Sequence, residues 1–516
     1  MLTMSSALDR CARLYASRAA IIDAEATFTW VQHLDRVARA AGVLQAMGLR
    51  PGDRFGTLSR NTFRHAELLH AGYWSGLVPV PVNIRLAPPE IGYILQDAEV
   101  KALAVDEPFL GLLDHPAIRP CAAGALAIAP PAPGRRVPVY ENLLDQAQPA
   151  PLHHSSEQDD AILLYTGGTT GRSKGVRLTH LNVVANGMQV GLAWYCREEE
   201  VYLHVAPMFH SADLLGTAFT LLGGGHAYLP QFSPAHLLKA MQDLRVTRTM
   251  LAPTMIIMTL QQEAPARYDL ARMRSILYGS APMALEWIRR TLEAFPAVDL
   301  VQAYGLTETS PILTILGADE HRQAAASGDM RRLKAAGRPL PGIDLRILDD
   351  MDREVACGEP GEVCVRGPNV TRGYLNQPEV SAAAFRGGWF HTGDVGCTDA
   401  DGYMYLLDRK KDMIITGGEN VYSSEVEQVI YQHPDVSECA VVGVPDEVYG
   451  EALYAVIVPA PGRTITQEAL IEHCRGRIAG YKIPRQVAVV AELPKSAMGK
   501  ILKSELRRLH GDARHR

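Results

Sequence analysis

The sequence predicts an α/β protein with a large N-terminal domain of mostly parallel sheets flanked by helices, a small β-rich subdomain, and a small α+β C-terminal domain. Three observations support this fold class. The 516 residues are more than one hydrophobic core usually organises. From Asp160 onward, short apolar runs alternate with helical patterns, which is typical of parallel sheets. After Gly337, short strand patterns separated by Gly and Pro turns indicate the β-rich subdomain.

The N-terminal stretch is predicted to be mainly helical. Residues 6–48 have a helical pattern with a β-like break at 26–30. Residues 51–54 form a turn. The valine-rich segment 77–82 reads as extended, but its two prolines restrict it to an edge strand or less. Residues 120–133, rich in Pro and Ala, are expected to form an irregular surface connection.

The middle of the chain supplies the alternating pattern. Strands are expected at 161–165, 201–205, 226–229, 248–251 and 275–278. Further strands are expected at 344–348, 361–366 and 402–408 in the β-rich subdomain, and at 438–444 and 452–458 near the C-terminus, with a helix at 425–433 that ends before Pro434.

Composition narrows the class of function. The chain is 47% hydrophobic and 21% charged, with a net charge of −6, so we expect a globular protein that does not bind nucleic acid. None of the eight cysteines lies at a Cys-x-x-Cys spacing, so a zinc site is not expected. The uncharged stretch 214–229 is too short and too interrupted by glycines for a membrane span. With no signal-peptide pattern, we expect a cytoplasmic protein. The oligomeric state stays open, a homodimer included.

A glycine- and threonine-rich loop follows the strand at 161–165. It contains Thr166, Gly167, Gly168, Thr169, Thr170, Gly171 and Lys174. Glycines let backbone N–H groups approach an anion closely, threonine hydroxyls add donors, and the lysine adds a cation, so the loop suits a polyphosphate. It is not a Walker A loop, because the lysine follows Ser173 and precedes Gly175. A P-loop ATPase is therefore disfavoured.

This loop is similar to the signature of the adenylate-forming superfamily, which comprises acyl-CoA synthetases, peptide-synthetase adenylation domains and beetle luciferases. The family usually has Ser where Gly168 stands and Pro where Ser173 stands. The glycines, threonines and lysine remain, so we expect ATP binding to persist.

A second segment, Gln302-Ala303-Tyr304-Gly305-Leu306-Thr307-Glu308, resembles another signature of the same family. The resemblance implies that Tyr304 stacks on adenine, that Thr307 holds a phosphate oxygen, and that Glu308 binds Mg²⁺, a cation that prefers carboxylate and phosphate oxygens. Gln302, Ala303 and Gly305 would lie along the nucleotide.

Two further segments complete the implied nucleotide site. Ser280, Ala281 and Pro282, which follow Gly279, resemble the family segment beside the adenine and the acyl group. Asp394 and Arg409 resemble the residues that contact the ribose hydroxyls.

The resemblance also implies a mobile lid. Residues 1–408 would bind ATP and the acid, 409–411 would form a hinge with Lys411 at its centre, and 412–516 would form the C-terminal lid domain. Gly417 and Gly418 would line a tunnel for pantetheine, and Lys500 would be the lysine that assists adenylation.

The acyl pocket is expected near His210, Gly279, Ala303, Gly305, Ser310, Pro311 and Ile312. His210 resembles the family residue beside the carboxylate, although a lone His in an apolar run can also be a packed core residue. These segments contain no Arg or Lys, which argues against a dicarboxylate. Asp213 could face a substrate amine or cap a helix. A fatty or aromatic monocarboxylate fits best.

The sequence therefore predicts an AMP-forming carboxylate–CoA ligase that uses ATP, Mg²⁺ and coenzyme A. Lys500, Glu308, Lys174, Thr307 and His210 are its candidate catalytic residues. Three alternatives stay open: a stand-alone enzyme that loads a carrier protein, a luciferase-like oxygenase, and a catalytically silent nucleotide-binding homologue.

Overall fold

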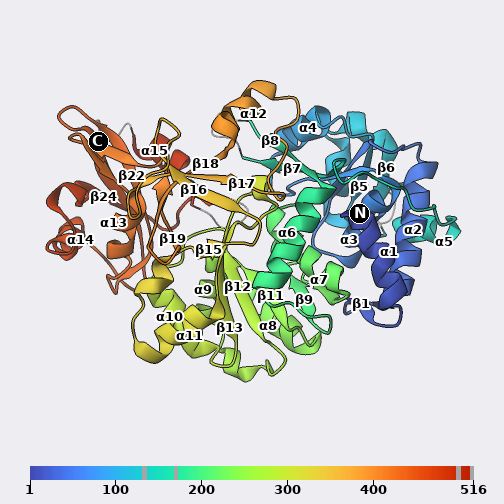
Figure 1. The fold of residues 1–516 in the computed structure, drawn as a ribbon, viewed down its shortest axis with the longest axis horizontal. Coiled ribbons are helices and arrows are strands. Elements are labelled where there is room, and N and C mark those ends of the chain that lie inside the picture. The colour runs from blue at the N-terminus through green and yellow to red at the C-terminus, as the bar shows by residue number, and fades with distance from the viewer. Residues whose placement is uncertain (131–135, 168–171, 496–500, 512–516) are drawn as a thin grey trace.

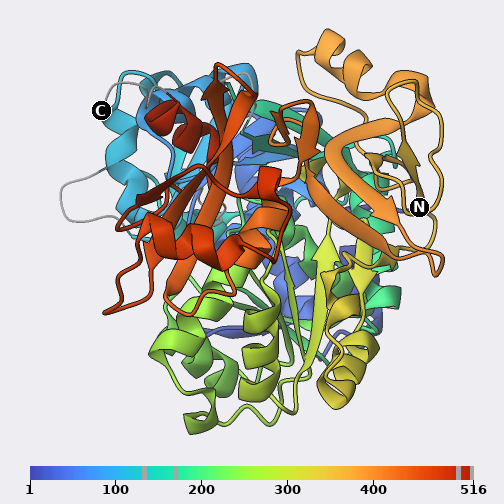
Figure 2. The same cartoon turned by 90° about the vertical axis from the view of Figure 1, so that its left-hand side faces the viewer.

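The computed structural model describes residues 1–130, 136–167, 172–495 and 501–511 (Figure 1). A large N-terminal part contains two open sheets covered by helices, and a smaller C-terminal part has a sheet of its own. Figure 1 shows the C-terminal sheet, orange to red, at one end of the molecule, and Figure 2, viewed from that end, shows it beside the orange four-stranded sheet. The predicted α/β fold class is confirmed.

The largest sheet has nine strands in the order β15-β14-β13-β12-β11-β9-β10-β1-β2. Its central strands, from β1 to β13, are all parallel, and the strands at both edges pair antiparallel. The strands are β1 Ala19–Ile22, β2 Thr27–Thr29, β9 Val201–His204, β10 Gly225–Tyr228, β11 Arg248–Leu251, β12 Ser275–Gly279, β13 Asp299–Tyr304, β14 Thr314–Leu316 and β15 Arg338–Pro339. The four strands expected between residues 201 and 278 are thus confirmed.

Helices connect and cover these strands. They are α6 His180–Ala193, α7 Gly216–Leu222, α8 Pro234–Asp243, α9 Pro253–Gln262, α10 Leu285–Ala294 and α11 Ala318–Ser327. The 3₁₀ segments are η1 Glu107–Asp114, η2 Arg119–Gly124, η3 Ser211–Leu215, η4 Pro265–Arg267, η5 Thr307–Thr309, η6 Arg331–Lys334, η7 Arg386–Gly388 and η8 Gly480–Lys482. Residues 214–229 contribute α7 and β10, and Phe219 in their middle is fully buried, as expected of core. No helix of the described residues has the length and hydropathy needed to cross a bilayer.

A second, four-stranded parallel sheet has the order β4-β3-β5-β6. Its strands are β3 Arg54–Leu58, β4 Val78–Pro81, β5 Ala102–Val105 and β6 Ala125–Ala127, and its neighbouring helices are α1 Met4–Leu14, α2 Trp30–Ala46, α3 Phe63–Ser75, α4 Pro88–Asp97 and α5 Tyr140–Gln146. β4 is an edge strand, as its prolines predicted.

Three local expectations in the N-terminal half were wrong. Residues 19–22 form strand β1 inside the stretch expected to be helical. Residues 125–127 form the buried strand β6 inside the expected surface connection, because Ala-Leu-Ala can pack on β5 where polar residues could not. Strand β7, Asp160–Thr166, pairs antiparallel with β8, Lys174–Thr179, in a separate hairpin. The connection between β7 and β8 is too short for a parallel crossover.

The remaining sheets match the sequence pattern closely. The β-rich subdomain is an antiparallel sheet of β16 Asp344–Leu348, β17 Gly361–Arg366, β18 Phe390–Thr398 and β19 Met404–Arg409, with α12 Pro378–Ala384 beside it. The C-terminal sheet contains β20 Ile414–Thr416, β21 Glu419–Val421, β22 Val436–Asp446, β23 Gly450–Pro459 and β24 Gln486–Val489, packed with α13 Ser423–Ile430, α14 Gln467–Cys474 and α15 Lys503–His510. The change of sheet falls between β19 and β20. The exact domain limits and the hinge remain predictions.

Candidate active site

The carboxyl ends of β12 and β13 lie side by side, because the two strands are parallel and Gly279 is paired with Ala303. Ligands of open α/β sheets bind at such strand ends. A Cβ atom on Gly279 would lie 2.5 Å from the Ala303 carbonyl oxygen, and one on Gly305 would lie 1.9 Å from the Pro311 carbonyl oxygen. Both positions therefore require glycine, so that the chain segments beside the site can approach each other closely.

The sequence-predicted residues at this edge differ in exposure. Ala303, Pro311 and Ile312 are buried, Gln302, Gly305 and Ala281 are half-buried, and Ser280 and Pro282 are exposed. The Gln302 side-chain oxygen lies 3.4 Å from the Tyr278 hydroxyl. The segments that follow β12 and β13 thus contain both buried and exposed residues beside the same sheet edge.

Asp394 is the centre of a buried polar cluster. Its Oδ1 forms an ion pair with Arg409 Nε at 2.6 Å, and its Oδ2 accepts a hydrogen bond from the Tyr304 hydroxyl at 2.7 Å. Burial, followed by the nearby Asp394 charge, raises the pKa of the Tyr304 hydroxyl well above its usual range. Tyr304 therefore stays a neutral donor, and its ring is held in one orientation by Asp394.

Glu308 lies in a second polar cluster with Lys174. The Tyr374 hydroxyl donates to Glu308 Oε1 at 3.0 Å, and Lys174 Nζ lies 5.2 Å from the centre of the Tyr374 ring. Burial and the Glu308 charge raise the pKa of the Tyr374 hydroxyl, so it remains a donor. The Thr371 N–H donates to the Glu308 carbonyl oxygen at 2.7 Å. The structure thus brings together a cation and a carboxylate that are far apart in sequence.

Thr307, next to Glu308, lies beside the segment that follows β9. Its hydroxyl oxygen is 2.9 Å from that of Ser211, and one of the two hydroxyls donates to the other. The structure describes only part of the predicted phosphate loop. Thr166 and Lys174 face each other across the β7–β8 hairpin, and Gly167 is exposed, whereas Gly168, Thr169, Thr170 and Gly171 lie outside the described residues.

His210, and not Asp213, caps the 3₁₀ segment η3. The His210 side chain caps η3, because the Ala212 N–H donates to its Nδ1 at 3.3 Å. Asp213 is therefore not the cap, and its carboxylate instead contacts His204. His210 is half-buried and also lines a cavity beneath η3. Its position beside the substrate carboxylate stays a prediction.

The other expected acyl-pocket residues form the backbone turn after η5. Ile312 is fixed by Asn186, whose side chain accepts from the Ile312 N–H at 3.1 Å and donates to its carbonyl oxygen at 2.8 Å. The Ser310 hydroxyl is buried without a hydrogen-bond partner among the described residues.

The expected hinge residue Lys411 lies between β19 and β20, and the expected lid residues Gly417 and Gly418 lie in the turn between β20 and β21 of the C-terminal sheet. Lys411, Gly417 and Gly418 are exposed, and both glycines have positive φ angles, +60° and +86°. Lys410 Nζ lies 2.8 Å from Asp350 and 3.4 Å from Glu362. Lys500 lies outside the described residues.

Three residues that the sequence analysis did not single out join the predicted ones. Tyr374 links Lys174 to Glu308, Ser211 contacts Thr307, and Glu362 accepts from the Gly393 N–H at 3.1 Å, next to Asp394. A lone Tyr after Gly, or a Ser after His, carries no periodic signal. Only the fold brings these side chains to the strand ends.

Comparison with known proteins gives two family matches. The model described as AMP-binding enzyme matches residues 8–375. The model described as AMP-binding enzyme C-terminal domain matches residues 425–500. Together the two models span both parts of the fold.

Individual relatives match nearly the whole chain. A feruloyl-CoA synthase of Amycolatopsis is 38% identical over 505 residues, which cover 97% of this chain and 98% of the relative. An indoleacetate–CoA ligase of Aromatoleum aromaticum is 34% identical, with 98% of each chain covered. Among solved structures, ATP-bound MatB from Rhodopseudomonas palustris superposes with a TM-score of 0.88 at 32% identity, with 99% of both chains covered.

Proposed function

Because this chain belongs to the AMP-binding enzyme family, we propose a course for its reaction in which the two polar clusters described above act on ATP and on an aromatic acid. The protein is an AMP-forming acid–CoA ligase. It converts ATP and a carboxylic acid into an acyl-adenylate and pyrophosphate, and then the acyl-adenylate and coenzyme A into an acyl-CoA and AMP.

The observation that carries the proposal is the presence of two polar clusters around the end of β13: Tyr374 with Lys174 and Glu308, and Asp394 with Tyr304 and Arg409. The first cluster offers a cation and a carboxylate to the phosphates. The second offers carboxylate oxygens that can accept hydrogen bonds from the ribose hydroxyls.

In the first half-reaction, a substrate carboxylate oxygen forms a bond to the α-phosphorus, and the bond from that phosphorus to the bridging oxygen of pyrophosphate breaks. Carboxylate and triphosphate repel each other, so the site must offset charge and align the reacting atoms. Lys174 would offset phosphate charge. Thr307, whose hydroxyl already contacts Ser211, would bind a phosphate oxygen, and His210 would lie beside the acid.

The Glu308 side chain fits Mg²⁺. Among the described residues, Tyr374 is its hydrogen-bond donor and engages Oε1 alone, so Oε2 remains for a hard cation that prefers carboxylate and phosphate oxygens. When bound, Mg²⁺ supplies positive charge beside the triphosphate. Tyr374, through its hydrogen bond to Oε1, would fix the Glu308 carboxylate that would hold the ion.

In the second half-reaction, the thiol of coenzyme A forms a bond to the acyl carbon, and the bond from that carbon to the AMP oxygen breaks. No nucleophile of the protein is required. We propose that the lid turns about Lys411 between the two half-reactions, which removes Lys500 and brings Gly417 and Gly418 over the pantetheine. The positive φ angles of both glycines support a tight turn there.

The aromatic character of the acid is supported by two relatives, a feruloyl-CoA synthase and an indoleacetate–CoA ligase. The expected pocket segments contain no Arg or Lys, so they offer nothing to a second substrate carboxylate. We place the enzyme in the cytoplasm, where ATP and coenzyme A are available.

The experiment is to incubate the protein with ATP, Mg²⁺, coenzyme A and a panel of aryl, fatty and dicarboxylic acids, and to measure AMP release. AMP formation that requires both an acid and coenzyme A, and that is fastest with aryl acids, is the expected result. Adenylate without thioester would instead indicate a carrier protein as acceptor. Absence of AMP with every acid would overturn the proposal in favour of a silent nucleotide-binding homologue.

A further inference from the structure

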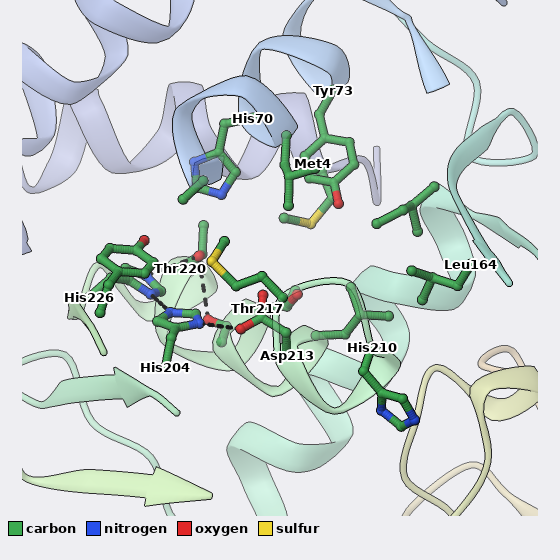
Figure 3. A pocket seen from close by; sticks show the side chains of 17 residues that line it. Met4, His70, Tyr73, Leu164, His204, His210, Asp213, Thr217, Thr220 and His226 are labelled. Carbon is green, nitrogen blue, oxygen red and sulfur yellow. Dashed lines mark hydrogen bonds and ion pairs between the residues drawn. The ribbon is translucent and has the colours of Figure 1, made fainter. Parts of the chain in front are cut away.

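A small cavity lies beneath η3 and is enclosed by α3, α7 and the end of β7 (Figure 3). Its walls are mostly apolar, with Met4, Leu69 and Leu164 among them. The volume of the cavity is about 40 Å³. Since one water molecule needs roughly 10–15 Å³, the cavity has room for a group of a few non-hydrogen atoms.

One side of the cavity carries a chain of hydrogen bonds, which Figure 3 shows as dashed lines. Asp213 Oδ1 lies 2.5 Å from His204 Nδ1, His204 Nε2 lies 2.9 Å from His226 Nδ1, and His226 Nε2 lies 3.1 Å from the Thr220 hydroxyl. An ionised carboxylate only accepts, so His204 donates to Asp213. Burial lowers the pKa of His226 well below its usual range, so this ring is neutral. Thr220, His226, His204 and Asp213 thus form one connected chain of hydrogen bonds along this side of the cavity.

This chain leaves acceptor capacity at the cavity. Asp213 Oδ2 has no hydrogen-bond donor among the described residues, and the side chain is 12% exposed. A carboxylate with one oxygen unsatisfied in an apolar wall is costly unless a donor reaches it. The cavity is therefore built to accept a hydrogen bond from its occupant.

A second polar group faces the cavity from α3. His70 Nδ1 lies 2.9 Å from His33 Nε2, and in the described part of the chain its Nε2 has no hydrogen-bond partner. Burial, together with the nearby His204, lowers the pKa of His70 to about 4, so the ring is neutral. Figure 3 shows His70 across the cavity from His204 and Asp213. An occupant that donates to Asp213 can thus exchange a second hydrogen bond with His70.

The cavity is next to the site of adenylation. Ser211, whose hydroxyl contacts that of Thr307, and Asp213 belong to the same 3₁₀ turn. Such a turn rises about 2 Å per residue, so the backbones of the two residues lie about 4 Å apart along the turn. His210, which we place beside the acid, also lines the cavity.

We propose that the cavity between Asp213 and His70 receives a hydrogen-bond-donating substituent, a hydroxyl or an amino group, on the aromatic ring of the acid at the end remote from its carboxylate. The inference rests on the proposed function and names the substrate class within it. Asp213 would repel a second carboxylate at that end, and an unsubstituted ring would leave the acceptor unsatisfied.

The first test uses the wild-type enzyme and matched acids that differ only at the remote ring position, which bears hydrogen, hydroxyl, amino, methyl or carboxylate. The readout is kcat/KM for AMP formation. A hydrogen bond to a charged group contributes about 1.5–3 kcal/mol. The kcat/KM of the acid with a hydroxyl substituent, or of the acid with an amino substituent, should therefore exceed that of the unsubstituted acid at least tenfold. The ratio of the hydroxyl to the amino arm decides which donor the site prefers.

The second test uses Asp213→Leu, which removes the acceptor and keeps a similar volume. The advantage of the donor-bearing acids should fall to about threefold or less, while kcat/KM for the unsubstituted acid changes little or rises. Asp35→Asn, at an exposed carboxylate on α2, is the matched control and should keep the wild-type ratio.

The outcomes separate the inference from the proposed function. Activation of unsubstituted acids with no gain from a donor would overturn the inference and leave the ligase assignment intact. Failure to activate any acid would overturn both. The first test uses only the wild-type enzyme. It can therefore overturn the inference even if Asp213→Leu does not fold.

Discussion

Asp394 and Arg409 are directly opposite each other on the antiparallel strands β18 and β19, and Arg409 Nε forms an ion pair with Asp394 Oδ1 at 2.6 Å. Arg409 is also the first residue of the proposed hinge. If Asp394 binds the ribose, the same ion pair joins the nucleotide to the start of the lid. A change of lid position would then be felt at the ribose without a further relay.

Replacing Arg409 by glutamine should weaken ATP binding more than acid binding. The variant keeps a donor but loses the charge that faces Asp394. A hydrogen bond to a charged group contributes about 2 kcal/mol, so KM for ATP should rise about thirtyfold. Steady-state kinetics with ATP and the acid varied separately measure this.

The matched control is Arg332→Gln. Arg332 pairs with Asp399 at 2.6 Å at the other end of the same pair of strands, and its side chain is 33% exposed against 35% for Arg409. Equal rises in KM for ATP in the two variants would show that general damage to the sheet, and not the nucleotide contact, is responsible.

Replacing Tyr374 by phenylalanine tests the link between Lys174 and Glu308. The ring beneath Lys174 remains, and only the donor to Glu308 Oε1 is lost. We expect about a tenfold fall in acid-dependent pyrophosphate exchange, because the carboxylate is less well oriented, and a higher requirement for Mg²⁺. Titration of Mg²⁺ at fixed ATP gives both values.

Tyr403→Phe provides the comparison for this change. The Tyr403 hydroxyl donates to Glu320 at 2.6 Å on the outside of the nine-stranded sheet. This variant should keep the wild-type dependence on Mg²⁺. An unchanged dependence in Tyr374→Phe would remove the support for Glu308 as the metal ligand.

The sequence predicted most of the fold because its strands have strong local signals. Residues 361–366, for example, form β17 with these same limits. The failures came where tertiary context decides. An apolar run such as 161–165 fits a hairpin strand as well as a parallel strand. Only the short connection between β7 and β8 distinguishes the two cases.

The candidate site was predicted in its motifs but not in its contacts. Tyr304 was expected to stack on adenine, and the structure adds that its hydroxyl is held by Asp394. Tyr374 and His204 could not be found, because each acts through a partner that is distant in the sequence. A linear pattern cannot show that two such residues meet.

Gly305→Ala should damage the site through packing alone. An added Cβ would lie 1.9 Å from the Pro311 carbonyl oxygen, and backbone cannot yield as a flexible side chain does. Overpacking of this kind costs about 1–3 kcal/mol or more, so the midpoint of thermal unfolding should fall and AMP formation should be lost.

Gly111→Ala is the control for this substitution, because an added Cβ there meets no atom within 4 Å and the residue is exposed. It should keep the wild-type midpoint and activity. A Gly305→Ala enzyme that retained both would show that the turn beside β13 can shift.

Stability should fall on mild acidification. Burial lowers the pKa of His65, His70 and His180 to about 4 each, whereas an unfolded histidine has a pKa of about 6.5. Their contribution is therefore fully present above pH 6.5 and is lost as the pH falls toward 4. At pH 5 each ring should lower the free energy of unfolding by about 2 kcal/mol.

Denaturant unfolding at pH 7 and pH 5 measures this effect. His65→Gln should show a smaller loss between the two pH values than the wild type, and His236→Gln, at an exposed ring, should show the wild-type loss. Equal losses in all three proteins would indicate that carboxylates and not the buried rings cause the acid sensitivity.

Lys500→Ala should separate the two half-reactions. The resemblance gives Lys500 the task of offsetting the charge that develops when the carboxylate attacks the α-phosphorus, so pyrophosphate exchange should fall by at least a hundredfold. Thioester formation from a supplied acyl-adenylate should be nearly unchanged, because the lid has by then withdrawn this lysine.

Lys411→Pro should show the opposite pattern, since it restricts the hinge and impairs the second half-reaction more than the first. Equal loss of both half-reactions in both variants would contradict a lid that alternates between them.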